Sequence, residues 1–163
     1  MSEEKANHEL RPKKPFWTHI ALHVNDIDKT IAWYEEFTHL SLLHRGEDEN
    51  GFNAWVGDAS QPDSPFVLVL AQFLDGKDPF APAKHPVLGP FAHIGIEVPS
   101  KEMVDEIAAR AKEADCLALG PMQMPKQIGY ICFLKDPNGN MVEFSYDQGV
   151  YEKAREIWGS DKS

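Results

Sequence analysis

The chain has 163 residues and a formal net charge of −10 at pH 7, with 26 acidic against 16 basic side chains. This length suits one globular unit, or two small modules that share a core, but not two independent domains. The acidic balance lacks the cationic footprint that nucleic acids and anionic membrane surfaces require. We therefore expect a small-molecule partner, with no nucleic-acid or membrane partner.

No targeting or membrane segment is predicted. Residues 1–15 are polar and charged, without the apolar run of a secretory signal, and the apolar stretch 66–73 has the length of a strand rather than a bilayer span. Cys116 and Cys132 belong to no paired pattern, which favours reduced thiols. We expect a flexible N-terminal tail over 1–15 and a cytoplasmic location.

An internal repeat organises the chain. The segments THIALHVND at 18–26 and AHIGIEVPS at 92–100 share the pattern His-Ile-small-apolar-X-Val, followed by a residue that can cap a helix. Asp26 and Ser100 are these caps, and apolar residues follow each of them at helical spacing. Each half of the chain is therefore predicted to place one helix after its first strand.

Short runs bounded by Gly, Asp, Asn or Pro follow each helix and predict strands. They lie at 40–45, 52–57 and 66–73 in the first half, and at 116–119, 130–135 and 140–146 in the second. The turn Asp136-Pro137-Asn138-Gly139 joins the last two runs and is typical of a hairpin. The order strand, helix, three strands therefore occurs twice, which predicts an α+β fold.

The remaining segments complete the predicted organisation. Residues 75–90 are rich in Pro and Gly and indicate a linker or a loop over a pocket. Apolar residues at helical spacing between Tyr151 and Trp158 predict a C-terminal helix packed on the body. We expect a single domain over 16–146, built from modules 16–74 and 91–146 around the linker 75–90, and then a C-terminal helix and tail over 147–163.

Strand alternation places three polar side chains on open sheet faces. Alternate residues of a strand share a face, so His19 and His93 lie opposite the aliphatic residues that face the helices. Glu143 lies in mid-strand, where an acidic residue is costly to bury unless it is paired or binds a metal. Two imidazoles and one carboxylate with open coordination positions suit Fe(II), and also Mn, Ni, Co or Zn. We predict one divalent metal ion, Fe(II) favoured, on His19, His93 and Glu143.

His23 shares the face of His19 but cannot share its ion. Four strand steps of ~3.3 Å separate the two residues by about 13 Å. His23 is either a polar lining residue or a pocket residue that contacts substrate or acts as an acid or base. Glu143 and His23 are the candidate catalytic groups for moving a proton. His85, in the linker, is a possible lid residue.

Three segments resemble the vicinal-oxygen-chelate superfamily, which includes glyoxalase I, bleomycin resistance proteins and extradiol dioxygenases. They are HIALHVNDIDKTIAWYEEF at 19–37, AHIGIEV at 92–98 and FLKDPNGNMVEF at 133–144. The resemblance implies two βαβββ modules that form an open, cleft-shaped mixed β-sheet barrel with flanking helices around a metal. His19, His93 and Glu143 match three of the ligand positions of the family. It also implies a homodimer.

The resemblance implies a divalent-metal-dependent enzyme that binds a small substrate through two adjacent oxygens and stabilises the charge that develops on them. Extradiol-dioxygenase-like chemistry is slightly favoured, because the fourth metal ligand of glyoxalase I has no counterpart here. Val69 or Leu70 stands at its position, and only Gln72, nearby on the same strand, could replace it by reaching the metal. His23 stands where glyoxalase I carries an arginine for the glutathione carboxylate. A glyoxalase I-like lyase or isomerase, of the lactoylglutathione lyase type, is the alternative. A metal-free, drug-sequestering protein is a further alternative, although such members generally lack these ligands.

Overall fold

The computed structural model describes residues 15–62, 66–89 and 91–159; the tail expected over 1–15 and the end of the chain, 160–163, lie almost wholly outside these ranges. The helices are α2 (Ile27–Phe37), α3 (Lys101–Glu113) and α4 (Val150–Trp158). The strands are β1 (His19–His23), β2 (Ser41–Asp48), β3 (Gly51–Gly57), β4 (Val67–Phe73), β5 (Ile94–Glu97), β6 (Leu117–Gln123), β7 (Tyr130–Lys135) and β8 (Met141–Tyr146).

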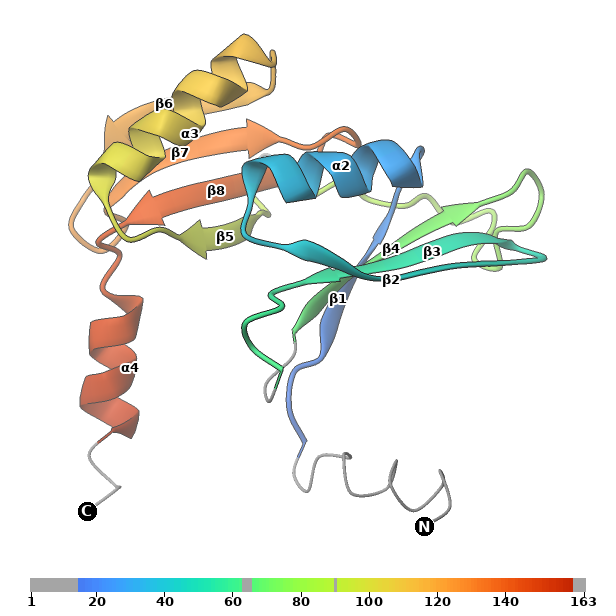
Figure 1. Cartoon of the computed structure of the whole chain (residues 1–163), viewed down its shortest axis with the longest axis horizontal. Helices are drawn as coiled ribbons and strands as arrows, with labels where there is room; N and C mark the ends of the chain where they lie inside the picture. The colour runs from blue at the N-terminus through green and yellow to red at the C-terminus, as the bar shows by residue number, and fades with distance from the viewer. Residues whose placement is uncertain (1–14, 63–65, 90, 160–163) are drawn as a thin grey trace.

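The strands form two four-stranded mixed sheets, in the orders β1-β4-β3-β2 and β5-β8-β7-β6 (Figure 1). In each sheet the first strand pairs in parallel with the last strand of its module, and the remaining pairs are antiparallel. The twofold repeat and the α+β class predicted from the sequence are confirmed. The sheets are not closed, and β1 and β5 each lie at an edge.

The two module helices begin where the sequence places their caps. The carboxylate of Asp26 accepts from the backbone N–H of Lys29, and the hydroxyl of Ser100 accepts from that of Met103. These bonds satisfy helix N–H groups that have no partner within the helix. Each helix then buries its apolar stripe against the sheet of its own module.

The modules are joined through α2, which lies between the two sheets in Figure 1. The hydroxyl of Tyr34 donates to the buried carboxylate of Asp136 at 3.2 Å. Asp136 also accepts from the backbone N–H groups of Asn138 and Asn140, at 2.8 Å each. These bonds hold the β7–β8 turn, in which Gly139 adopts the left-handed conformation with φ of 91°. The hairpin predicted from the sequence is therefore also a contact between the modules.

We expect Asp136→Ala to lower the free energy of unfolding by about 2 kcal/mol, because it leaves the buried Tyr34 hydroxyl without its acceptor and removes the acceptor of two backbone N–H groups. Urea unfolding measures the change. Tyr34→Phe is the matched control, since it removes one bond only and should cost about 1 kcal/mol. Equal losses in both variants would contradict this account of the turn.

The C-terminal helix differs from the prediction in its packing. Helix α4 forms at the expected residues, but Ile157 and Trp158 are 58% and 76% exposed, and Figure 1 shows the helix projecting from the body. The expectation that it packs on the body is wrong for this chain. The apolar spacing predicts that a helix forms, but it does not specify the surface against which the helix packs. No helix among the described residues is long and apolar enough to cross a membrane.

Candidate metal centre

His93 and Glu143 come together on the second sheet. His93 directly precedes β5, and Glu143 lies in mid-β8 opposite Gly95. Nε2 of His93 lies 3.6 Å from Oε2 of Glu143. Nδ1 of His93 donates to the backbone carbonyl of Phe91 at 2.7 Å. Nε2 of His93 is therefore left without a hydrogen bond, next to a carboxylate oxygen of Glu143. Histidines that bind metals commonly use one ring nitrogen for the metal while a hydrogen bond from the other nitrogen orients the ring.

Glu143 is 4% exposed, and its two oxygens have different neighbours. Oε1 accepts from the side-chain amide of Gln148 at 2.6 Å, whereas Oε2 faces His93. Burial raises the pKa of the Glu143 carboxyl, and His93 and the Gln148 hydrogen bond oppose that rise. A positive charge placed beside Oε2 would stabilise this buried carboxylate. Gln148 lies beyond the last strand and carried no sequence signal of its own.

His19 lies on the other sheet, at the start of β1. It is exposed, and its Nδ1 shares a hydrogen bond with the Thr18 hydroxyl at 2.9 Å. Its Nε2 is therefore left free in the same way as that of His93. Across the described ranges, no three His, Cys, Asp or Glu side chains of one chain gather in a group able to hold a metal ion. The structure thus brings together two of the three predicted ligands and leaves His19 apart.

A large aromatic side chain stands two residues ahead of each histidine of the repeat. Trp17 precedes His19 and is 80% exposed, and Phe91 precedes His93 and is 90% exposed. His19 on the first sheet and the His93–Glu143 pair on the second are therefore each flanked by an exposed aromatic side chain.

His23 contacts the linker rather than the metal ligands. Its ring stacks on that of His85, with centroids 4.2 Å apart, and Phe73 packs against both rings. Nε2 of His85 donates to the Asp78 carboxylate at 2.8 Å. The pKa of His23 is lowered by burial and then by His85, while Asp78 opposes the change. The linker is thus held against β1 by the residue predicted for a lid.

We expect the stability of the protein to fall on acidification through His23. Its pKa in the folded protein lies below the ordinary value of 6.5, so the unfolded chain binds the proton more readily. The stabilisation is present above pH 6.5 and is lost as pH falls through the lowered value. Thermal unfolding between pH 8 and 5 should show a steeper loss for the native chain than for His23→Phe, which keeps an aromatic ring but cannot titrate. Parallel profiles would contradict the assignment.

Gln72, considered in the sequence as a fourth ligand, and two aromatic residues of β7 have defined partners. The Gln72 side-chain oxygen accepts from the backbone N–H of Ile27 at 2.8 Å, so it serves the start of α2 rather than a metal. The hydroxyl of Tyr130 donates to Asp105 of α3 at 2.7 Å. Phe133, which pairs with Glu143 across the sheet, packs edge-on against His93. An aromatic wall without a hydroxyl therefore stands beside the His93–Glu143 pair.

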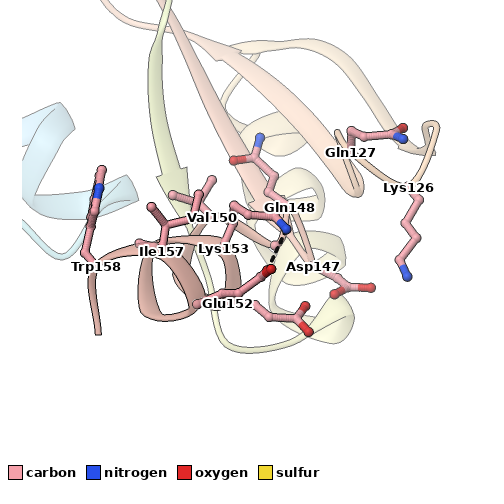
Figure 2. A pocket seen from close by; sticks show the side chains of 12 residues that line it. Lys126, Gln127, Asp147, Gln148, Val150, Glu152, Lys153, Ile157 and Trp158 are labelled. Atoms are coloured by element: carbon pink, nitrogen blue, oxygen red, sulfur yellow. Dashed lines mark hydrogen bonds and ion pairs between the residues drawn. The ribbon is translucent and has the colours of Figure 1, made fainter. Parts of the chain in front are cut away.

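A groove of about 700 Å³ follows α4 and includes Gln148, which contacts Glu143. Figure 2 shows Gln148 at the start of the helix, with Lys126 and Gln127 of the β6–β7 turn across from it. Ile157 and Trp158 line its far part. Gln148 thus connects the groove with the carboxylate of Glu143.

Residues 17–144 match the family model of the Glyoxalase/Bleomycin resistance protein/Dioxygenase superfamily. The chain belongs to this superfamily. It is 37% identical over 134 residues to the uncharacterized protein PA2024 of Pseudomonas aeruginosa, a match that covers 82% of this chain and 90% of that protein. It is 29% identical over 127 residues to a probable chloroplastic lactoylglutathione lyase of Arabidopsis thaliana, with 77% of this chain and 34% of the plant protein covered.

Solved structures from the superfamily have the same fold. The trypanothione-dependent glyoxalase I of Leishmania major superposes with a TM-score of 0.63 at 20% identity, over 90% of this chain and 99% of the enzyme. A variant of the fosfomycin resistance protein FosX of Listeria monocytogenes, solved with Mn(II) and a dihydroxypropylphosphonic acid, superposes with a TM-score of 0.59 at 17% identity, over 85% and 95% of the two chains. At such identities the likeness concerns the fold alone.

Proposed function

We propose that the protein is a divalent-metal-dependent enzyme that binds a small substrate through two adjacent oxygens. The observation that carries the proposal is the His93–Glu143 pair, in which a free imidazole nitrogen and a buried carboxylate oxygen lie 3.6 Å apart. Two protein ligands of one ion lie at about this spacing, since each binds at roughly 2.0 to 2.2 Å. When bound, a divalent ion supplies a Lewis acid for the two substrate oxygens.

We propose that the third ligand, His19, comes from a second copy of the chain. His19 lies apart from His93 and Glu143 within one chain, yet its free Nε2 matches that of His93. The exposed Trp17 and Phe91 give a second copy an apolar surface to cover beside each half of the ligand set. A twofold dimer would then form two equivalent sites, each from β1 of one copy and β5 and β8 of the other.

In this site the side chains of the chain have distinct tasks. Gln148 holds Oε1 of Glu143 and leaves Oε2 directed at His93. Phe133 covers the histidine ring and excludes water from one side. His23, whose lowered pKa favours the neutral ring, lies on β1, where it can contact substrate or accept a proton. Glu143, with its raised pKa, is the nearer candidate for moving a proton.

We favour extradiol-dioxygenase-like chemistry. Two histidines and one carboxylate with open positions suit Fe(II), and Gln72 caps α2 instead of adding a fourth ligand. A glyoxalase I-like lyase or isomerase is the second candidate, supported by the raised pKa of Glu143 and by the similarity to a probable lactoylglutathione lyase. A metal-free binding role is the third, and the His93–Glu143 geometry argues against it.

Anaerobic purification followed by elemental analysis tests the proposal. We expect about one equivalent of divalent metal per chain in the native protein and none in His93→Ala. With iron, dioxygen uptake on addition of 4-methylcatechol would support the dioxygenase, and turnover of the hemithioacetal of methylglyoxal and glutathione would support the lyase. A native protein that neither contains nor takes up Fe, Mn, Ni, Co or Zn would refute the metal-dependent function.

A further inference from the structure

Buried polar atoms without partners gather beside the His93–Glu143 pair. Among the described residues, three buried side-chain polar atoms lack a hydrogen-bond partner, and two of them are Oε2 of Glu97 and Oγ of Ser145. These two residues face each other across the parallel pair of β5 and β8. Ser145 is only 1% exposed. Buried polar groups are normally satisfied, so an adjacent unsatisfied pair points to a missing partner.

The pair lies on the same sheet face as the predicted metal ligands. Alternation along β5 puts His93, Gly95 and Glu97 on one face, and alternation along β8 puts Glu143 and Ser145 on that face as well. Two strand steps separate Glu143 from Ser145, which is roughly 7 Å along the sheet. A side chain built at Gly95 would meet no atom within 4 Å. There is therefore open space on this face between His93 and Glu97.

The chemistry of the two atoms selects what they would bind. Oε1 of Glu97 accepts from the backbone N–H of Gln148 at 3.2 Å, which leaves Oε2 as a free acceptor. The Ser145 hydroxyl can either donate or accept. Glu143 adds a second carboxylate close by, and among the described residues no Lys or Arg forms an ion pair with either glutamate. An anionic group is disfavoured here, whereas a group that donates hydrogen bonds is favoured.

We propose that Glu97 and Ser145 form a specificity subsite for a hydroxyl or ammonium group of the substrate. A short carbon chain would join this group to the part of the substrate that carries the two chelating oxygens. An ammonium donates to both atoms, and a hydroxyl donates to Glu97 while accepting from Ser145. This inference rests on the proposed function, because it assumes that the substrate oxygens lie at the ion on His93 and Glu143. It adds a substrate class: neutral or cationic compounds with a donor group, rather than compounds that end in a carboxylate.

Four catechols with the same two-carbon arm test the subsite on the metal-loaded dimer. They are 4-ethylcatechol, 4-(2-hydroxyethyl)catechol, 4-(2-aminoethyl)catechol and 3,4-dihydroxyphenylacetate, and anaerobic calorimetry measures their Kd. The hydroxyl and ammonium probes should bind about tenfold more tightly than 4-ethylcatechol, and the carboxylate probe more weakly. Glu97→Gln should abolish the ammonium preference and Ser145→Ala should reduce both preferences, while Glu102→Gln on exposed α3 leaves them unchanged.

Equal Kd values for the four probes, or preferences that survive in both variants, would overturn the subsite while leaving the metal function intact. Failure of 4-ethylcatechol itself to bind the metal-loaded protein would overturn the dioxygenase-like chemistry and the subsite together, while failure of the protein to take up metal would overturn the proposed function.

Discussion

Glu143→Gln should bind divalent metal at least a hundredfold more weakly than the native protein. The loss of a partner that merely orients a ligand costs about ten- to a hundredfold in metal affinity, and Glu143 is proposed as a ligand itself. The variant keeps its shape and its contact with Gln148, so the fold should not change. Competition with a fluorescent chelator measures the affinity. Glu102→Gln, an exposed acidic residue on α3, is the matched control.

The same variant should be more stable than the native protein when both are metal-free. Because the pKa of Glu143 is raised in the folded protein, the protonated carboxyl is preferred there, and its stabilisation is lost as pH rises through the raised value. At neutral pH the native protein bears the cost of a buried charge, which the neutral amide of the variant does not carry. Weaker metal binding accompanied by lower stability would instead indicate simple misfolding.

Mixing two inactive variants should restore metal sites. In a dimer of His19→Ala with Glu143→Ala, one site lacks both residues, whereas the other has His19 from one copy and His93 with Glu143 from its partner. Random exchange makes about half of the dimers mixed, each with one intact site, so about a quarter of the native metal content should return. Elemental analysis after unfolding and co-refolding gives the number.

The controls for this mixture are each variant refolded alone and a mixture of His93→Ala with Glu143→Ala. Both residues of the second pair lie on the same half of the site, so every site in that mixture is defective. We expect no recovered metal in any of these controls. Absence of recovery in the first mixture, with dimers formed, would place the whole site within one chain.

Much of the fold could be predicted because it depends on local pattern. The caps Asp26 and Ser100 and the Asp136 turn act over a few residues, and each is found at the expected place. Glu143 was also identifiable, since a mid-strand carboxylate in an alternating pattern calls for a partner. The contact between Tyr34 and Asp136 spans 102 positions of sequence and could not be predicted. It is one of the contacts that join the two modules, together with the hydrogen bond from the Asn138 amide to the Thr30 hydroxyl.

The parts of the site that sequence reasoning missed also come from distant segments. Gln148 reaches Glu143 only because the chain turns back after β8. His85 was named as a possible lid residue, but its stacking on His23 could not be predicted, because composition alone does not specify that the linker folds against β1. Glu97 did carry a signal, because it continues the alternation of His93 and Gly95, and its importance became visible only with the unsatisfied oxygen.

Strands β1 and β5 lie at the edges of their sheets, and this position affects the tendency of the protein to aggregate. An uncovered edge strand presents backbone groups to which other chains can add, and this is a common route to aggregation. In the proposed dimer the metal ion ties together two copies at these edges, beside the exposed Trp17 and Phe91. Metal supply would then govern not only catalysis but also how long newly made chains escape aggregation.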